Sequence, residues 1–195
     1  MSGLLADKNA AVERVRGLLN STPDCTLIGI VGKPGAGKST LSQYISESIN
    51  SPQLAVLPMD GFHLSNAVLA ELHRLDRKGA PDTFDVAGFI ALLTRIRNEE
   101  DSHIYYPIFD RSIEESIAAQ GVINSDTKAV IVKEITYFIK RMDGSTLPKF
   151  FMKLGISILM ISYEWKDLSH DILRMERAKV LLNSGLVEAM KEMQN

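Results

Sequence analysis

The chain has 195 residues, of which 22 are basic and 24 acidic, so its formal net charge is −2. A balance this close gives no field directed at nucleic acid or at an acidic membrane, and we expect neither as a partner. No run approaches the ~20 apolar residues of a membrane span, and the length suits one α/β domain over residues 1–195.

The first predicted element is an N-terminal helix within residues 1–22. Its charges are scattered, and apolar residues recur at helical spacing, which predicts an amphipathic helix rather than a signal peptide. Those apolar residues are Leu4, Leu5, Val12, Val15, Leu18 and Leu19. The single cysteine, Cys25, has no partner for an intramolecular disulfide. This is typical of a reducing compartment, and we expect a cytoplasmic protein.

The next segment carries the most specific motif of the chain. Residues 32–39 read Gly-Lys-Pro-Gly-Ala-Gly-Lys-Ser, which matches the phosphate-binding pattern G-x-x-x-x-G-K-[ST]. The apolar run 26–31 before it predicts a buried parallel strand, and the spacing of apolar residues over 39–50 predicts a helix. Backbone N–H groups of such a turn converge on phosphates, and the helix dipole adds partial positive charge.

Two side chains of this motif have expected roles in nucleotide binding. Lys38 would reach the β- and γ-phosphates, and the Ser39 hydroxyl would ligate Mg²⁺. The alternative is a glycine-rich strand-to-helix turn without a ligand, but the lysine and serine in register and the two matching flanks argue against it. The sequence therefore predicts a site for a nucleoside triphosphate.

Apolar runs alternate with helical patterns along the rest of the chain. The strand candidates are residues 27–31, 54–58, 104–108, 129–132 and 156–161. The alternation predicts an α/β three-layer fold: a doubly wound, mostly parallel five-stranded sheet with helices on both faces. Ligands bind at the carboxyl ends of such strands, so we expect Asp60, Asp110 and the phosphate-binding loop at one rim. Asp85 precedes an apolar helical face and is predicted to cap a helix.

Asp60 is the candidate catalytic side chain, because it directly follows the strand at 54–58. Phosphoryl transfer needs charge neutralisation and often a base near the acceptor hydroxyl. A carboxylate at this position could take that proton or hold Mg²⁺ through water. The alternative is a strand-end Asp that caps the turn before Gly61. Nearby His63 reads equally well as a functional residue and as an ordinary loop histidine.

Two charged pairs complete the set read from the residues. Arg77 and Lys78 could clamp a substrate anion, although a solvated basic pair is the usual meaning of such a dipeptide. Asp110 and Arg111 close a strand and could contact the substrate or form a surface ion pair. The aromatic side chains of that strand, predicted to pack in the core or along the strand rather than to stack on a base, are Tyr105, Tyr106 and Phe109.

Together these motifs resemble those of a known family. The strings GKPGAGKST, LPMDGFH, RKGAPDTFDV, YYPIFDRSIEESI and AVIV occur in this order over residues 25–132. They are similar to the P-loop small-molecule kinases grouped with uridine kinase, phosphoribulokinase and bacterial-type pantothenate kinase. Within that group they most resemble the fructose-transport-system-kinase-like branch, also described as nucleoside triphosphate hydrolase domain proteins.

The resemblance implies an ATP-dependent phosphotransferase acting on a hydroxyl of a nucleoside-, pantothenate- or sugar-like metabolite, with ATP and Mg²⁺ as cofactors. The residues that it assigns to ATP and Mg²⁺ are Gly32, Lys33, Pro34, Gly35, Ala36, Gly37, Lys38, Ser39 and Thr40. Those that it places around the acceptor are Asp60, as the base, with His63, Arg77, Lys78, Asp82, Phe84, Asp110 and Arg111. In the family a lid helix brings arginines to the ATP phosphates. Within residues 165–195, expected to hold lid and C-terminal helices, Arg174 and Arg177 share a helical face and could do so, or could lie on a solvated helix.

The resemblance is interrupted at the fourth predicted strand. Where the family pattern has Val-Glu-Gly-Asn-Tyr-Leu-Leu, residues 132–137 read Val-Lys-Glu-Ile-Thr-Tyr, so Lys133 stands at the acidic position. Strand alternation would turn the displaced Glu134 to the opposite side. Deleting one base from codons for the family pattern yields this reading, and we hypothesise two compensating single-base changes across residues 133–144, which the coding DNA would test.

The altered segment keeps a second function open. A P-loop nucleotide-binding protein or slow NTPase without small-molecule kinase activity is the alternative to a kinase, and Lys133 favours it. The chain also ends, at Asn195, before we expect the last strand and base-binding loop of the family. Neither the acceptor nor the formation of a homodimer can be read from the residues.

Overall fold

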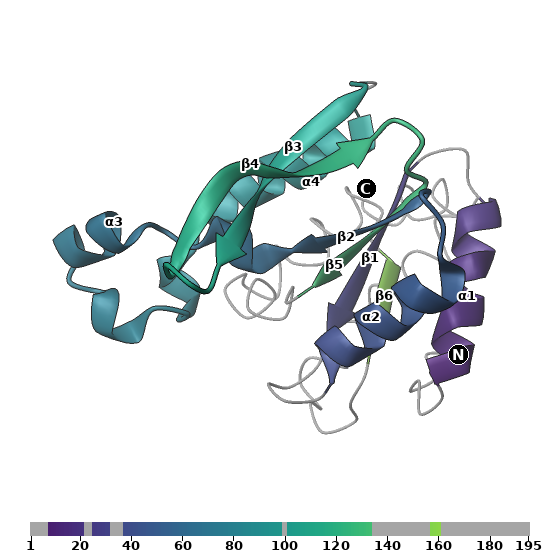
Figure 1. The fold of residues 1–195 in the computed structure, drawn as a ribbon, viewed down its shortest axis with the longest axis horizontal. Coiled ribbons are helices and arrows are strands. Elements are labelled where there is room, and N and C mark those ends of the chain that lie inside the picture. The colour runs from purple at the N-terminus through teal and green to yellow at the C-terminus, as the bar shows by residue number, and fades with distance from the viewer. Residues whose placement is uncertain (1–7, 22–24, 32–36, 99–100, 134–156, 161–195) are drawn as a thin grey trace, which may run out of the picture.

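The computed structural model describes residues 8–21, 25–31, 37–98, 101–133 and 157–160. In it, four strands form a parallel sheet in the order β2-β5-β1-β6 (Figure 1). Their bounds are Thr26–Val31 (β1), Leu54–Pro58 (β2), Ala129–Lys133 (β5) and Ser157–Met160 (β6). Each neighbouring pair is parallel, so the strands end at the same edge. The predicted α/β class is confirmed, and four of the five predicted strands lie in this sheet.

Helices cover both faces of the sheet, as predicted. Helices α1 (Lys8–Ser21) and α2 (Lys38–Ile49) pack on one face, where Ala129 and Ile131 of β5 enter the same buried cluster. On the other face, Val130 and Val132 join the cluster under α4 (Val86–Asn98). The period of two along β5 thus assigns successive residues to different cores. Asp85 caps α4, because its Oδ1 accepts from the Gly88 N–H at 2.9 Å.

The predicted strand at 104–108 is real, but its assignment to the parallel sheet was wrong. It belongs to β3 (His103–Asp110), which pairs antiparallel with β4 (Glu115–Asn124) in a separate two-stranded sheet. The short turn after β3 reverses the chain at once, and a parallel neighbour would have needed a long crossover. Strand β4 escaped prediction because its Ala, Gln, Ser and Gly residues have low strand propensity.

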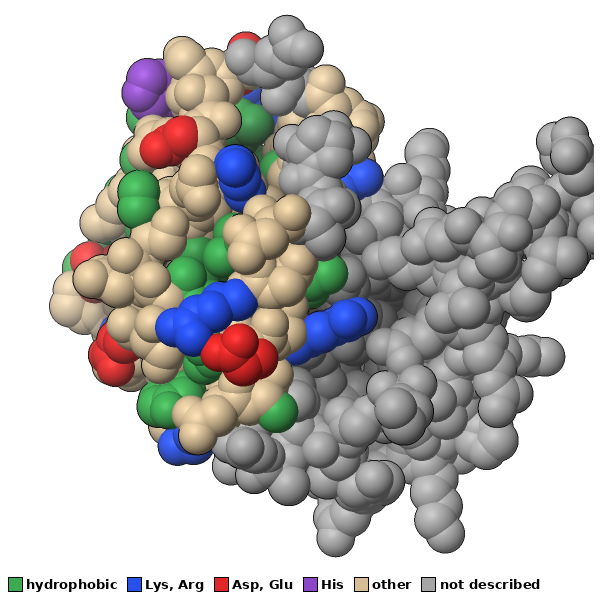
Figure 2. All heavy atoms as spheres, turned by 90° about the vertical axis from the view of Figure 1, so that its right-hand side faces the viewer, with side chains coloured by type: hydrophobic (Ala, Val, Ile, Leu, Met, Phe, Trp, Pro, Cys, Tyr) green, Lys and Arg blue, Asp and Glu red, His purple; other side chains and the backbone are tan. Residues whose placement is uncertain are grey.

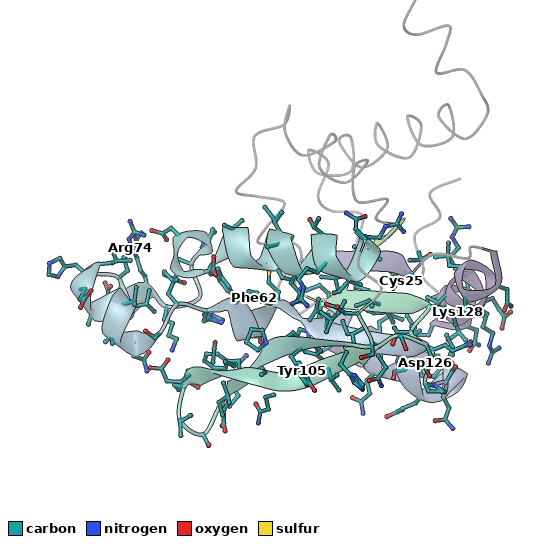
Figure 3. The ribbon with its side chains drawn as sticks, turned by 90° about the horizontal axis from the view of Figure 1, so that it is seen from above. Cys25, Phe62, Arg74, Tyr105, Asp126 and Lys128 are labelled. Atoms are coloured by element: carbon teal, nitrogen blue, oxygen red, sulfur yellow. The ribbon has the colours of Figure 1, made fainter. Side chains whose placement is uncertain are left out.

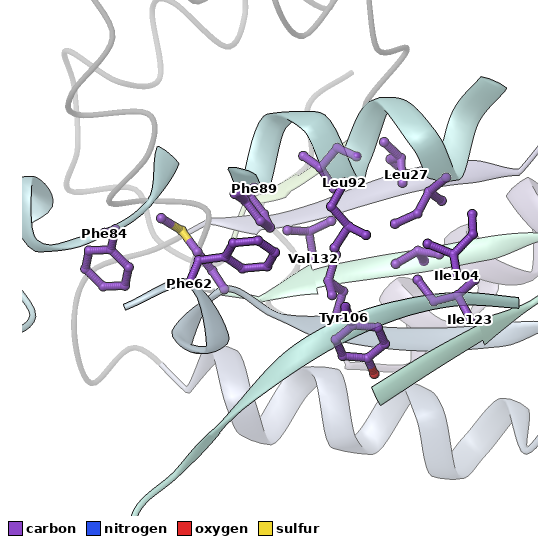
Figure 4. Close-up of a cluster of buried hydrophobic side chains, with 14 residues drawn as sticks. Leu27, Phe62, Phe84, Phe89, Leu92, Ile104, Tyr106, Ile123 and Val132 are labelled. Atoms are coloured by element: carbon purple, nitrogen blue, oxygen red, sulfur yellow. The ribbon is translucent and has the colours of Figure 1, made fainter. Parts of the chain in front are cut away.

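The β3–β4 hairpin packs beside β2 and closes the core under α4 (Figure 4). Ile104, Tyr106 and Ile123 of the hairpin are buried in that cluster, and the Tyr106 hydroxyl donates to the Val56 carbonyl oxygen at 3.3 Å. Of the two predicted positions, Tyr106 packs in the core and is 9% exposed. Tyr105 is 57% exposed and lies along the strand, with its ring centroid 6.4 Å from that of His103. Strand alternation turns the two tyrosines to opposite faces.

Between β2 and α4 the chain leaves the sheet and returns. It passes through η1 (Met59–Phe62), α3 (Asn66–Glu71), η2 (Leu75–Arg77) and η3 (Pro81–Thr83). We call residues 64–83 the α3 arm; Figure 3 shows Arg74 near its outer end, far from Lys128. The two ends of the arm lie next to each other, because the Leu64 N–H donates to the Thr83 carbonyl oxygen at 2.9 Å.

The end of the molecule at which β1, β2 and β5 begin carries charges of both signs. Acidic and basic side chains lie close together on its described part (Figure 2). Glu13 pairs with Arg16 at 2.7 Å, and Arg95 pairs with Asp101 at 2.8 Å. Within the described ranges, no helix has the length and apolar character needed to cross a membrane.

Candidate active site

The described part of the phosphate-binding motif is the start of α2. Gly37 precedes the helix with φ 84°, a left-handed conformation that favours glycine. Lys38 follows as the first helical residue and is only 6% exposed, while Ser39 and Thr40 are exposed. Gly37 offers no side chain to cap the first turn, so the N–H groups of this helix end can serve an anion. This arrangement fits a bound triphosphate. The predicted ligands Gly32, Lys33, Pro34, Gly35 and Ala36 lie outside the described residues.

Asp60 lies in η1, directly after β2, where its carboxylate is partly exposed. Its Oδ2 accepts from Arg111 Nη2 at 2.8 Å, and this ion pair joins η1 to the turn after β3. The contact depends on Gly61, because a Cβ at that position would lie 2.0 Å from the Pro107 carbonyl oxygen. Glycine therefore allows η1 and β3 to meet closely enough for the Asp60–Arg111 pair.

The imidazole of His63 lies beside this pair and is held on both sides. Its ring centroid is 4.0 Å from that of Phe84 and 4.8 Å from that of Phe109. Nδ1 lies 2.6 Å from the Asp60 carbonyl oxygen, which can only accept, so Nδ1 carries the proton and Nε2 is an acceptor. Burial lowers the pKa of His63 below its ordinary 6.5, which favours the neutral ring.

Two cations lie over the ring of Phe109. Lys78 Nζ and Arg111 Cζ are each 5.0 Å from its centroid. The Lys78 ammonium is engaged within the protein, since it donates to Asn66 Oδ1 at 2.6 Å and to the Glu114 carbonyl oxygen. The structure thus brings Asp60, His63, Lys78, Phe84 and Arg111 into one cluster.

The remaining predicted acceptor residues make local contacts. Asp82 pairs with Arg77 at 2.5 Å and with Arg74 at 3.4 Å, which ties the α3 arm together. Asp110 Oδ1 accepts from the hydroxyl and the N–H of Ser112 at 2.6 and 2.8 Å. These hydrogen bonds lower the pKa of Asp110. The predicted lid residues Arg174 and Arg177 are outside the described part of the chain.

Asn66, Glu114 and Glu115 also border the cluster, and sequence reasoning missed them. Asn66 Nδ2 donates to the Glu114 carbonyl oxygen at 3.2 Å, and its backbone N–H donates to Glu115 Oε1 at 2.9 Å. These contacts join residues 48 and 49 positions apart, so no local spacing signals them.

A groove of about 340 Å³ runs along α2 beside the middle of β2 and the end of β5. Its lining residues are Ser39, Ser42, Gln43, Ser46, Glu47, Val56 and Lys133. Lys133 pairs in register with Pro58 at the end of β2. The basic residue that replaces the family's acidic one therefore shares a groove with Ser39, the predicted Mg²⁺ ligand. No group of three or more His, Cys, Asp or Glu side chains within the described ranges is placed to hold a metal. Residues 134–144 of the altered segment are outside those ranges.

Comparison with known proteins shows the family of the chain, although no family model matches it. A proposed uridine kinase of Schizosaccharomyces pombe is 37% identical over 116 residues, which cover 54% of this chain and 48% of that protein. The pantothenate kinase of Brucella ovis is 31% identical over 93 residues, 42% of this chain and 29% of that protein. The matches to these curated relatives thus cover half of their length or less.

A solved structure extends the similarity over most of the fold. The crystal structure of a proposed fructose transport system kinase from Silicibacter has a TM-score of 0.67 and 30% identity. The match covers 90% of this chain and 84% of that protein. The parallel sheet and the start of α2 define an α/β P-loop protein. The chain belongs to the P-loop kinase superfamily that includes uridine kinase, pantothenate kinase and fructose transport system kinase.

Proposed function

We propose that the chain is an ATP-dependent phosphotransferase that acts on a hydroxyl of a small metabolite. One observation carries this proposal: Asp60, paired with Arg111 and flanked by His63, follows β2 at the edge where α2 begins. Parallel strands place the carboxyl ends of β1 and β2 on one side, which favours ligand binding there. The kinase names of the relatives support the same reaction class.

Each side chain has a defined task in this proposal. When bound, Mg²⁺–ATP supplies the phosphoryl group. Lys38 contacts phosphate oxygens and stabilises charge that develops during transfer, and the Ser39 hydroxyl ligates the metal. Asp60 orients the acceptor hydroxyl and takes its proton, while Arg111 fixes the direction of that carboxylate. Neutral His63 contributes Nε2 as an acceptor of a substrate hydrogen bond.

Labelled ATP tests the reaction class. The chain is incubated with ATP carrying labelled γ-phosphate and a pool of small metabolites, and organic products are separated from free phosphate. We expect label on an organic product. In Asp60→Asn we expect transfer to fall by about 10²–10⁴-fold, because a general base contributes that much. ATP binding should be retained, and full transfer in this variant would remove Asp60 from the role of base.

Lys133 favours a second candidate function. A protein that only binds nucleotide, or that hydrolyses it slowly, can tolerate the loss of the acidic residue that the family carries at the end of this strand. Here a cation lines the groove next to Ser39, where it opposes rather than assists metal binding. Release of free phosphate alone, at a low rate, would support this candidate. Lys133→Glu would then be expected to raise transfer if the altered residue is what limits the site.

A further inference from the structure

A triangle of hydrogen bonds joins the α3 arm to the turn between β3 and β4. Asn66 donates from Nδ2 to the Glu114 carbonyl oxygen at 3.2 Å and accepts at Oδ1 from the Lys78 ammonium at 2.6 Å. Lys78 also donates to the Glu114 carbonyl oxygen, so each corner is bonded to the other two. The triangle connects segments that the sequence separates widely.

Glu114 has an uncommon backbone conformation at this contact. Its φ is 52°, in the left-handed region, which costs a residue other than glycine ~1–2 kcal/mol. This conformation sets the direction of the carbonyl group that Asn66 and Lys78 both bind. Glu115 adds a further link, because its Oε1 accepts from the Asn66 N–H at 2.9 Å. The contacts with the α3 arm therefore stabilise the turn in a conformation that is unfavourable for the Glu114 backbone by itself.

The same turn carries Arg111, the partner of Asp60. Asp110 fixes the start of the turn through Ser112, and the triangle fixes its end. The Arg111 side chain is 72% exposed, and its packing is limited to the ring of Phe109. Its reach to Asp60 thus depends on the path of the turn backbone.

We propose that Asn66 and Lys78 are positioning residues of the acceptor site. Their hydrogen bonds hold the backbone of the Glu114 turn in place, and a turn held in this way keeps Arg111 paired with Asp60. Lys78 acts through Glu114 rather than by clamping a substrate anion. The consequence for phosphoryl transfer rests on the proposed kinase function. The hydrogen-bonded restraint on the Glu114 turn, and its effect on Arg111, can be measured without an acceptor.

Hydrogen exchange of the intact chain tests whether Asn66 and Lys78 restrain the Glu114 turn. Asn66→Ala and Lys78→Met each remove two hydrogen bonds, and we expect the amides of residues 112–116 to exchange about tenfold faster. Asn9→Ala is the matched control, because Asn9 Oδ1 accepts from the Tyr44 hydroxyl at 2.7 Å between α1 and α2. Exchange as in the unmodified chain in both folded variants would overturn the proposal.

NMR titration of the His63 ring tests whether Arg111 moves. Burial is the main cause of the lowered pKa of His63, and the charges of Lys78 and Arg111 lower it further. Arg111→Met should therefore raise the pKa of His63 in the unmodified chain, and should raise it less in an Asn66→Ala background, where the guanidinium has already moved away. An equal rise in both backgrounds would refute the positioning of Arg111.

The transfer assay separates this proposal from the proposed function. If the unmodified chain transfers label, Asn66→Ala should raise the apparent KM for the acceptor pool and leave the KM for ATP unchanged. Equal acceptor KM values would contradict the proposal. If the unmodified chain transfers no label, the proposed kinase function is wrong. The exchange and titration results then still show whether Asn66 and Lys78 restrain the turn and position Arg111.

Discussion

The nucleotide side and the acceptor side of the proposed site are built in different ways. On the nucleotide side, one contiguous motif runs from β1 into α2, and local backbone geometry places Gly37, Lys38 and Ser39. On the acceptor side, the cluster around Asp60 draws on η1, the α3 arm and the β3–β4 hairpin. A motif can therefore specify the first, whereas the second exists only once distant segments have packed. Substitutions should affect the two sides differently.

The largest effect is expected on the nucleotide side. Lys38→Ala should reduce nucleotide-dependent turnover by on the order of 10³-fold, because a positioned cation at the transferring phosphate is lost. Steady-state phosphate release and circular dichroism would check activity and folding together. Lys128→Ala, at an exposed position just before β5, is the matched control. Unchanged turnover in Lys38→Ala would mean that nucleotide chemistry takes place elsewhere, and that α2 does not form the nucleotide side of the site.

On the acceptor side, the largest expected effect is on folding. Gly61→Ala should lower the free energy of unfolding by about 3 kcal/mol, because the new Cβ meets backbone atoms of Pro107 that cannot rotate away. Gly17→Ala in α1 meets nothing within 4 Å and should instead stabilise the chain by about 0.5–1 kcal/mol. Chemical denaturation measures both. Equal behaviour of the two variants would show that η1 and β3 do not depend on close contact.

Arg111→Met separates catalysis from stability on the acceptor side. Transfer should fall by about 10–100-fold through loss of positioning, while basal ATP hydrolysis stays within about twofold. Arg95→Met removes an exposed ion pair of the same 2.8 Å length at the other end of the molecule. Both variants should cost less than about 1 kcal/mol of stability. If Arg95→Met slowed transfer equally, the effect would not belong to the site.

The smallest effect is a pH dependence of stability that arises from His63. Because burial lowers its folded-state pKa, the unfolded chain binds the proton more readily, and stability should fall as the pH drops below 6.5. Above that pH the contribution is fully present. Denaturation at pH 7.5 and 5.5 should show a smaller difference in His63→Gln than in the unmodified chain. His103→Gln, at an exposed position, controls for the loss of a histidine as such.

Sequence patterns predicted most of the central sheet because its strands are buried on both faces. Strands β1, β2 and β5 read as continuous apolar runs, and α2 and α4 show clear helical spacing. The hairpin was different: β3 was found and misassigned, and β4 was missed. Its one exposed face and weak strand propensity leave only pairing partners to define it, and those are not visible in local sequence.

For the site, sequence alone determined the phosphate-binding motif, the strand-end position of Asp60 and the family resemblance that drew His63, Lys78, Phe84 and Arg111 together. It could not determine what each side chain contacts. Tertiary structure decided that Arg111 pairs with Asp60 and that Lys78 joins Asn66 to the Glu114 turn. The physical reason is the sequence separation of the residues involved. Backbone geometry over a few residues is enough to form a phosphate-binding loop. A side-chain network that joins residues about 50 positions apart forms only after the chain has folded.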